Sequence, residues 1–468
     1  MSPDVVIVGA GPAGMSAAMA LRDCGAEVMV VDEQAASGGQ VFRSVNKTVR
    51  ERHSNLHLLG KDYARGEQLS RGFDTSGAEF VVSTSVWDLG GGADGPRISI
   101  ANSAGSRTLH PRHVILATGA MERPTPFPGW TLPGVMGVGA AQTLFKESGL
   151  VPDKRFVVAG SGPLLYLFTV QLLAAGARPE VLLDASSRFV PATHWPALLQ
   201  AFVADTKPLR KGLAWLGRLR RAGIHHLHGL NRLEAEGGQQ LERVLFSAAG
   251  DSGEIESDLL LVHDGVIPNT HLAMAAGCVH NWNNVQNYWA PRLDQNNASS
   301  VNGISIVGDA AGILGADAAM LAGRMTGFRV AHKLDLIDES HLETKVDKLR
   351  TALMKQRTLR RFLDRCYQPL PWFQQPSAQT VVCRCEQITA GEIRQATEMG
   401  AMGPNQLKAF TRCGMGPCLG RLCGNTVSRI CADVSGRPVS EVGHYNIRPP
   451  VRPITVEQLM QTQTDQSA

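Results

Sequence analysis

The sequence predicts an α/β fold in which two nucleotide-binding units of related design are followed by a small cysteine-containing domain. Three observations lead to this prediction. A pattern of strand, glycine turn, helix and strand occupies residues 5–32, and a similar pattern recurs at residues 155–184. Five of the nine cysteines then lie between Cys383 and Cys423. Such clustering indicates a local metal or redox site rather than scattered packing residues.

The composition is that of an ordinary globular protein. The 468 residues are 43% hydrophobic, and 46 basic against 42 acidic residues leave a net charge of +4. No basic run is long enough for a nucleic-acid groove, so nucleic acid is not an expected partner. The first strand follows directly after MSPD, which leaves no room for a secretory signal. We therefore expect a cytoplasmic protein, with peripheral association at the inner membrane face through a partner.

The first pattern has the spacing of a dinucleotide-binding site. Gly9, Gly11 and Gly14 form G-x-G-x-x-G between a predicted strand and a predicted helix. The first glycine permits the tight turn, the second lets backbone approach a pyrophosphate, and the third lets the helix pack closely on the strand. Asp32 ends the second strand, where its carboxylate would accept hydrogen bonds from a ribose. The motif alone leaves FAD and NAD open.

Three other segments resemble the flavin-binding segments of the thioredoxin and glutathione reductases. They are HVILATGA at residues 113–120, GISIVGDAAGI at residues 303–313 and GGQ at residues 38–40. In that family the aspartate of the G-D pair, here Asp309, contacts the ribityl-phosphate region of the flavin. The resemblance implies FAD. The FAD-site residues that we expect are Gly9, Gly11, Pro12, Ala13, Gly14, Asp32, Glu33, Gly39, Gln40, Arg43, Ala117, Thr118, Gly119, Gly308 and Asp309.

The second pattern matches the reductases' NAD(P)H-binding insert less well. Gly160 and Gly162 are present, but Leu165 stands where the third glycine is expected. A leucine at the helix–strand crossing would push the helix away from the sheet or change how a pyrophosphate can lie. We interpret Asp184, at the end of this pattern, as a strand end rather than a ribose ligand. We therefore do not expect the insert to bind NAD(P)H as the reductases do.

Three histidines, His225, His226 and His228, stand close together on a predicted strand edge. The sequence around them contains no acidic partner. We interpret them as surface residues rather than as ligands.

The C-terminal unit has roughly 70 residues, and a domain of this size usually needs a bound metal or another cross-link to stabilise its fold. Cys383 and Cys385 open it, and Cys413 and Cys418 follow after 27 intervening residues. Four thiolates on two loops are enough for a [2Fe-2S] cluster or a tetrahedral zinc ion. We take these four cysteines as the metal ligands. A redox cluster beside a flavin favours iron, although the spacing alone leaves zinc open.

Cys423 and Cys431 are expected to be packing residues. We expect a helix that begins at Cys418, and five residues along it rotate Cys423 by about 140° and raise it by about 7.5 Å. Cys423 should therefore face away from the other cysteines.

The segments CRCE and TRCGMGPCLGR resemble the bacterioferritin-associated-ferredoxin type of [2Fe-2S] module. With residues 122–146 and 159–167, they make the chain similar to the FAD/[2Fe-2S] alpha subunits of heteromeric dye-linked amino-acid dehydrogenases. This group includes the A chain of opine oxidase, the alpha chain of D-hydroxyproline dehydrogenase, the B chain of hydrogen cyanide synthase and, more distantly, the alpha chain of sarcosine oxidase. The resemblance implies a two-dinucleotide-binding-domain flavoprotein of the glutathione/thioredoxin reductase-like type with a small C-terminal [2Fe-2S] domain.

We divide the chain accordingly into six segments. They are the first segment of the FAD-binding domain (residues 1–125), the NAD-domain-like insert (126–290), the second segment of the FAD-binding domain (291–335), a helical linker (336–379), the [2Fe-2S]-binding domain (380–446) and a C-terminal tail (447–468).

In the resembling group the amino acid is oxidised at a flavin in a beta subunit, and the alpha subunit carries the electrons onward. We therefore expect an oxidoreductase subunit for CH-NH or CH-NH2 donors, with FAD and a [2Fe-2S] cluster as cofactors. The expected partners are a second FAD-containing (beta) subunit, a quinone or cytochrome-linked acceptor and, as a further candidate, a small ferredoxin-like subunit. Two alternatives stay open: a self-contained NAD(P)H-dependent reductase, and a scaffold that holds nucleotide and zinc for an enzyme partner.

Overall fold

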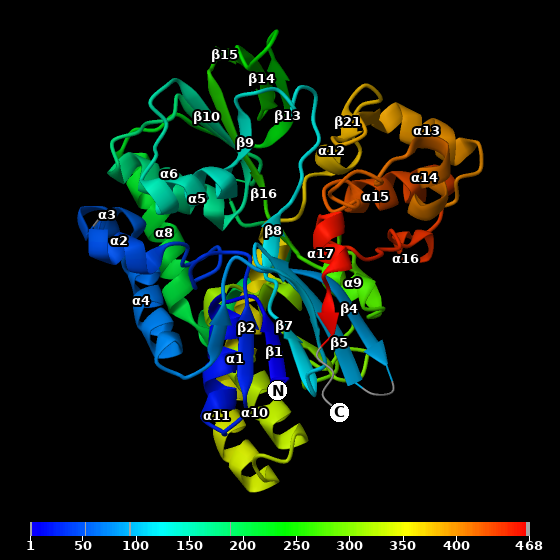
Figure 1. Cartoon of the computed structure of the whole chain (residues 1–468). Helices are drawn as coiled ribbons and strands as arrows, with labels where there is room; N and C mark the ends of the chain where they lie inside the picture. The colour runs from blue at the N-terminus through cyan, green and yellow to red at the C-terminus, as the bar shows by residue number, and fades with distance from the viewer. Residues whose placement is uncertain (1, 52, 93–94, 188, 465–468) are drawn as a thin grey trace.

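Two five-stranded parallel sheets and a small helical domain dominate the computed structural model, which describes residues 2–51, 53–92, 95–187 and 189–464. In Figure 1 the first sheet and its helices lie in the lower half, the second sheet lies above them, and the C-terminal domain lies to the side. The predicted two-unit α/β architecture is therefore present.

The first sheet is built around the buried strands predicted at the N-terminus. Its central strand β1 pairs with two neighbours, and helix α1 (Pro12–Arg22) packs against α10 (Ala316–Lys333) on one face. Both faces are covered, which is why the strands are continuous apolar runs. The strand order is β20 (Ile304–Ile306), β7 (His113–Leu116), β1 (Val5–Val8), β2 (Val28–Val31) and β3 (Glu79–Val81).

Two additions complete this first unit. Helices α2 (Val45–Glu51), α3 (His53–Leu59) and α4 (Lys61–Asp74) form one flank, and an antiparallel sheet forms another (Figure 1). The end of the chain adds a short strand to the edge of that sheet, and this strand pairs in parallel. The strand order of the sheet is β23 (Gln463–Thr464), β6 (Gly105–Leu109), β5 (Gly95–Asn102) and β4 (Ser85–Gly92).

The second sheet belongs to the inserted unit, and helices α5 (Val138–Ser148) and α6 (Pro163–Ala174) pack against it. The short ribbon of β8 (Ala120–Glu122) and β17 (Val266–Pro268) joins it to the first unit. Its strand order is β12 (His226–His228), β11 (Val181–Asp184), β10 (Phe156–Ser161), β16 (Leu259–Asp264) and β9 (Val135–Gly137).

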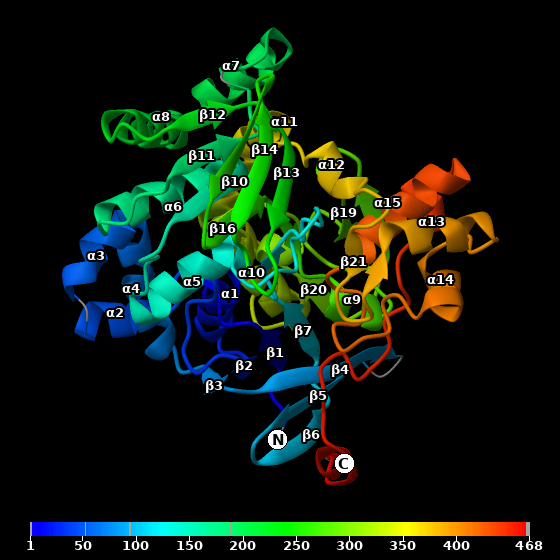
Figure 2. The same ribbon diagram turned by 90° about the horizontal axis from the view of Figure 1, so that it is seen from above.

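The insert contains further helices and strands outside its central sheet. Figure 2 shows α7 (Trp195–Ala204) and α8 (Thr206–Arg221) at its outer side, connecting β11 to β12. A separate antiparallel sheet is formed by the three strands that precede β16 in the chain. They are β13 (Leu230–Glu236), β14 (Arg243–Ala248) and β15 (Asp251–Glu256). The chain then returns through α9 (His271–Ala275), β18 (His280–Asn283) and β19 (Tyr288–Pro291).

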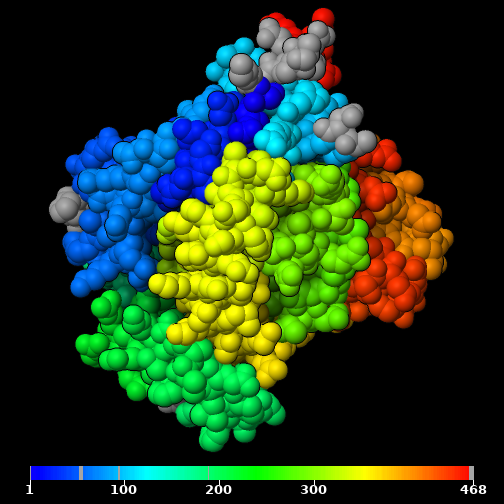
Figure 3. Space-filling model, turned by 90° about the horizontal axis from the view of Figure 1, so that it is seen from below, coloured from blue at the N-terminus to red at the C-terminus, as the bar shows by residue number. Residues whose placement is uncertain are grey.

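The long helix α11 (Glu339–Cys366) leads toward the C-terminal domain and packs against α10 and α7. In Figure 3, the yellow α10 and α11 form a band between the blue N-terminal segments and the light-green segment that borders the C-terminal domain. That domain contains α12 (Pro371–Gln374), β21 (Val381–Cys383), β22 (Ile388–Thr389), α13 (Ala390–Glu398), α14 (Pro404–Thr411), α15 (Gly424–Ser435) and α16 (Val439–Val442), and α17 (Val456–Met460) follows it.

The helix expected to begin at Cys418 begins six residues later. Helix α15 starts at Gly424, with Cys423 as its N-cap residue. The reason is the backbone between the two cysteines, because Leu419 and Gly420 both have positive φ angles, 53° and 77°. A helix cannot run through such residues, so the chain turns there instead.

Candidate functional site

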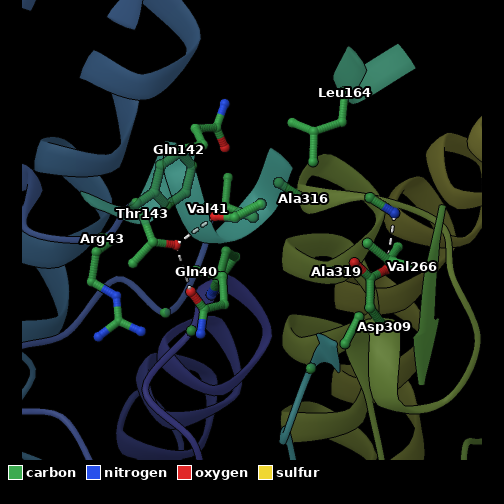
Figure 4. A pocket seen from close by; sticks show the side chains of 18 of the residues that line it. Gln40, Val41, Arg43, Gln142, Thr143, Leu164, Val266, Asp309, Ala316 and Ala319 are labelled. Carbon is green, nitrogen blue, oxygen red and sulfur yellow. Dashed lines mark hydrogen bonds between the residues drawn. The ribbon is translucent and has the colours of Figure 1, made fainter. Parts of the chain in front are cut away.

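A cavity of about 2010 Å³ lies between the two nucleotide-binding units. Its wall includes the glycine turns of both units, the ends of strands from both sheets, and two arginines from the C-terminal region, Arg421 and Arg452. In Figure 4, Gln40 and Arg43 lie on one side of this cavity, Asp309 lies on the other, and Leu164 of the insert lies above. Ligand and cofactor sites lie preferentially at such domain boundaries.

The first glycine turn has a shape that only glycine permits. Gly9 has a φ angle of 106°, and a Cβ atom on it would lie 2.5 Å from the carbonyl oxygen of Ala117. A Cβ atom on Gly14 would lie 1.9 Å from the carbonyl oxygen of Gly9, so α1 crosses β1 closely. Gly11, Pro12 and Ala13 line the cavity at the start of α1. This cradle fits a dinucleotide pyrophosphate at the helix N-terminus.

The Asp32 carboxylate organises this turn. Its Oδ2 accepts a hydrogen bond from the backbone N–H of Ala10 at 2.6 Å, and its Oδ1 accepts one from Gln34 at 2.8 Å. Burial raises the pKa of Asp32 above the usual range of an aspartate. Glu33 lines the cavity beside it and pairs with Arg452, whose Nη2 lies 2.9 Å from Oε2. Asp32 therefore shapes the loop and also lines the cavity.

The other predicted flavin-side residues converge on the same cavity. Asp309 Oδ1 accepts hydrogen bonds from the backbone N–H groups of Leu314 at 2.9 Å and Gly315 at 3.0 Å, which fixes the loop before α10. The remaining predicted residues that line the cavity are Gly39, Gln40, Arg43, Ala117, Thr118, Gly119 and Gly308. Residues distant in the sequence thus meet at one cavity.

Lys146 is absent from the predicted site residues, yet it lines this cavity from α5. Its Nζ donates a hydrogen bond to the carbonyl oxygen of Gln40 at 3.0 Å. Burial, together with the nearby positive charge of Arg43, lowers the pKa of Lys146 to about 7. Arg43 in turn lies 3.3 Å from Glu147. Lys146 is the last residue of the segment 122–146 that resembles the alpha subunits, but that resemblance assigns it no role, so the sequence does not single it out.

The second glycine turn differs in two details. Leu165, in the position of the third glycine, is fully buried in the core of the insert. Asp184, in the position of the ribose acid, is also fully buried and accepts hydrogen bonds from Tyr166 at 2.6 Å and Ser186 at 2.7 Å. Its carboxylate is therefore engaged by the protein itself, and a ribose would have to displace these bonds.

The cysteine loops bring their thiols together in two groups. The sulfur atoms of Cys383, Cys413 and Cys423 lie within 4.8 Å of one another and are buried. Cys385 and Cys418 form a second, more accessible pair whose thiols interact. The expectation that Cys423 faces away is wrong, because the turn at Leu419 replaces the helix on which it was based.

Small residues allow this packing. A Cβ atom on Gly416 would lie 2.3 Å from Cβ of Cys385, and one on Gly414 would lie 2.5 Å from the ring of Tyr445. The Tyr445 hydroxyl donates to Cys413 Sγ at 3.5 Å. Hydrogen bonds from the thiols of Cys413 and Cys423 hold the pKa of Cys383 well below its usual range. Buried thiolates with glycine turns around them can hold a thiophilic metal or cluster.

The cysteine loop also contacts the first nucleotide-binding unit. Burial lowers the pKa of His271 to about 4, so its neutral ring donates from Nε2 to the carbonyl oxygen of Leu419 at 3.2 Å. Leu419 packs against the core beside the first sheet, and Arg421 reaches the cavity wall. The sequence could not show this contact, because the two segments lie about 150 residues apart.

Family models match most of the chain. Residues 3–333 match the pyridine nucleotide-disulphide oxidoreductase family, and residues 377–463 match the sarcosine oxidase A3 domain. Among solved structures, L-proline dehydrogenase from P. horikoshii gives a TM-score of 0.69 at 19% identity, covering 98% of this chain and 79% of that one. Thioredoxin reductase from T. acidophilum gives 0.52 at 17% identity, covering 71% and 99%. These likenesses confirm the predicted fold.

Curated relatives are more similar in sequence. The A chain of opine oxidase from Rhizobium meliloti is 39% identical over 98% of this chain and 87% of its own length. The HcnB chain of hydrogen cyanide synthase from Pseudomonas aeruginosa is 33% identical over 96% of both chains. The alpha chain of sarcosine oxidase from Corynebacterium sp. is 27% identical over 58% of this chain and 30% of that one. The predicted resemblance and the prediction of an oxidoreductase are confirmed, and the chain belongs to the pyridine nucleotide-disulphide oxidoreductase family, in the group of the opine oxidase A chain.

Proposed function

We propose that the chain is the FAD- and [2Fe-2S]-containing electron-transfer subunit of a multimeric dehydrogenase or oxidase. The complex would oxidise the C–N bond of an amino acid or an opine-type secondary amine at a flavin in a partner subunit. The observation that carries this proposal is the contact between the cysteine loop and the nucleotide cavity, through Leu419 and Arg421. One chain therefore holds a dinucleotide cradle and a thiol cluster on adjoining elements.

The residues present fit FAD. Gly9, Gly11 and Gly14 leave room at the start of α1 for a pyrophosphate, and Asp309 fixes the loop that precedes α10. When bound, FAD exchanges electrons in pairs or singly, whereas a [2Fe-2S] cluster exchanges one at a time. The protein's own contribution would be to hold the nucleotide in the cavity between the two units, where Lys146 of the insert donates a hydrogen bond to Gln40 of the first unit.

We propose that the thiol cluster holds iron through Cys383, Cys385, Cys418 and one further cysteine. Spacing favours Cys413 as the fourth ligand, and the position of the Cys423 sulfur supports Cys423 equally well. Zinc would use the same thiolates, so metal analysis and the visible spectrum of the purified chain separate the two metals. Iron with sulfide bands supports the proposal, and zinc alone contradicts it.

The proposed partners follow from the names of the relatives. These are named as chains of an opine oxidase, a hydrogen cyanide synthase and a sarcosine oxidase. We propose a second FAD-containing (beta) subunit, with a quinone or cytochrome-linked acceptor and a small ferredoxin-like subunit completing the route. An opine, hydroxyproline or another secondary amine would then be held by the beta subunit.

We also propose a cytoplasmic location. In place of the expected association through a partner, we propose that α7 and α8 themselves bind peripherally at the inner membrane face. No helix in the described part of the chain is long and apolar enough to cross a membrane. Helix α8 carries six lysines and arginines and no acidic residue, which suits an anionic lipid surface. The exposed apolar residues on and near α7 and α8, which could enter the interface, are Phe189, Trp195, Leu199, Phe202, Val203 and Leu213.

Sedimentation with vesicles tests the membrane proposal. We expect binding to vesicles that contain anionic lipid and little binding to zwitterionic ones. Phe202→Glu should reduce the binding, whereas Val456→Glu, at an exposed site outside α7 and α8, should leave it unchanged. Equal binding by Phe202→Glu and the wild type would contradict this assignment.

The alternative of a self-contained NAD(P)H-dependent reductase is less well supported. Leu165 replaces the third glycine of the insert, and Asp184 is fully buried within its own hydrogen bonds. Anaerobic absorbance of the purified chain, recorded before and after adding NADH or NADPH, tests it directly. We expect the flavin bands to stay unchanged until the partner chain and its amine substrate are added. Rapid bleaching by NADH or NADPH would overturn the proposed function.

A further inference from the structure

Asp184, His226 and His228 form a second cluster of metal-ligating side chains, far from the cysteine loops in sequence. We propose that these three residues form a binding site for a divalent transition metal ion, Zn²⁺ by the chemistry of their donor atoms. This metal site is additional to the proposed function, which involves only the FAD cavity and the cysteine cluster. It lies in the insert, at the strand end where a nucleotide-binding domain would place its ribose acid.

Strand pairing brings the three residues together. Strands β11 and β12 run parallel at the outer edge of the second sheet (Figure 2), with Asp184 opposite His228 and Leu182 opposite His226. Side chains two residues apart on a strand share a face, so His226 and His228 both lie on the face of Asp184. His225 alternates to the other face and is exposed. The expectation that these histidines lack an acidic partner is therefore wrong.

The distances suit a tetrahedral ion. From Asp184 Oδ2, His226 Nε2 lies at 3.0 Å and His228 Nδ1 at 3.6 Å, and the three donor atoms lie within 4.8 Å of one another. Zinc bonds of about 2.0–2.2 Å at tetrahedral angles place neighbouring ligand atoms about 3.3–3.6 Å apart. The distance to His226 is slightly shorter than this range and the distance to His228 lies at its upper end, so small side-chain rotations would close the site around an ion.

Neighbouring side chains hold the carboxylate in place. The Tyr166 hydroxyl donates to Oδ2 at 2.6 Å, and the Ser186 backbone N–H and hydroxyl donate to Oδ1 at 2.8 Å and 2.7 Å. Ligating carboxylates are usually supported in this way by outer hydrogen bonds. Asp184 is fully buried, while the side chains of His226 and His228 are 17% and 27% exposed. An ion could therefore enter from the histidine side.

The donor set separates this site from the cysteine cluster. Two imidazole nitrogens and one carboxylate oxygen are ligands that Zn²⁺ accepts, with a fourth position left for water. The cysteine site offers thiolates, which give an intense charge-transfer absorption with Co²⁺ that nitrogen and oxygen ligands do not give. An ion at Asp184 would clamp β12, an edge strand, to β11.

Zinc titration of the purified full chain, in competition with a chromophoric chelator, tests the proposal. Besides any Zn²⁺ that the cysteine thiolates take up, we expect one bound Zn²⁺ that persists in the Cys383→Ser variant. His228→Ala and Asp184→Asn should weaken it by more than about 100-fold, and Tyr166→Phe, which removes a supporting hydrogen bond, by about 10- to 100-fold. His225→Ala is the matched control and should bind Zn²⁺ as the wild type does.

Two further measurements keep the test decisive. Co²⁺ bound at this site should give weak visible bands without thiolate charge transfer. If His228→Ala fails to fold, as judged by circular dichroism and flavin content, His226→Gln takes its place with the same expected loss. Unchanged Zn²⁺ affinity in folded variants, equal weakening by His225→Ala, or loss of the ion with Cys383→Ser would each overturn the proposal.

Discussion

The two nucleotide-binding units share a backbone design and differ in what surrounds it. In both, a positive-φ glycine near the end of the first strand lies against a neighbouring carbonyl group: Gly9 at 106° against Ala117, and Gly160 at 127° against His263. The first unit then has Gly14 at the helix crossing, whereas the second has Leu165. The first strand-end acid, Asp32, lines the cavity, and the second, Asp184, is fully buried.

This difference shows that the residues that form the backbone turn are distinct from those that allow a nucleotide to bind. The first two glycines are needed in both units because the strand must turn tightly into a helix, whether or not anything binds there. The third position and the partners of the strand-end acid decide whether a nucleotide can lie across the turn. A match to the first two glycines alone therefore indicates the fold, and the environment of the acid indicates the ligand.

The largest effect should come from giving the first unit the residue of the second. In Gly14→Leu, a side chain would start 1.9 Å from the carbonyl oxygen of Gly9, so α1 must move away from β1. We expect flavin occupancy after gel filtration to fall below about a tenth of the wild-type value, because the helix N-terminus no longer faces the pyrophosphate. Absorbance of the flavin relative to protein measures this. Normal occupancy would show that the third glycine does not separate the units.

A second prediction concerns the dependence of the first site on the cysteine domain. Cys418→Ser should abolish the iron–sulfur absorbance and leave bound FAD, because the glycine cradle belongs to other elements. Loss of both cofactors would contradict this independence. Cys413→Ser and Cys423→Ser form a matched pair that identifies the fourth ligand, since only the ligand's replacement should remove the cluster bands.

A third prediction concerns the leucine that distinguishes the second unit. Leu165 is fully buried beside Phe156 and Phe168, so Leu165→Ala should destabilise the insert by about 2–5 kcal/mol. We expect no gain of NADH binding, because Asp184 stays enclosed by Tyr166 and Ser186. Thermal unfolding and NADH titration by fluorescence measure the two effects. A gain of tight NADH binding would mean that Leu165 alone blocks the second site.

Features that depend on neighbouring residues could be predicted from this sequence, whereas contacts between residues far apart in the sequence could not. The strands Val5–Val8 and Val28–Val31 and the turn at Gly9 follow from local patterns, and the structure has them where the sequence predicts them. The predicted position of Cys423 is wrong because it assumes a helix where Leu419 adopts a positive φ angle. Leucine rarely adopts such an angle, so the sequence does not predict the turn. Asp184 and His226 lie 42 residues apart and meet only through the parallel pairing of β11 and β12.

The smallest predicted effect lies at the contact between the two units, where Lys146 of the insert donates to Gln40 of the first unit. Its pKa in the folded chain is about 7, against an ordinary value of 10.5. Between these pH values the unfolded chain binds a proton that the folded chain lacks, so this residue makes the free energy of unfolding rise with pH. The slope is at most about 1.4 kcal/mol per pH unit. Lys146→Met should lose this contribution, and Lys154→Met, at an exposed site, should keep it.

Melting temperatures at pH 7, 8 and 9 measure this difference. Relative to Lys146→Met, the wild type should gain stability as the pH rises across this range, because its buried ammonium group is progressively neutralised. The variant should also be the more stable of the two at pH 7 and below, where the wild type must bury a charge. Parallel curves for the two proteins would mean that Lys146 stays charged when folded, and that the units meet around a cation rather than a neutral amine.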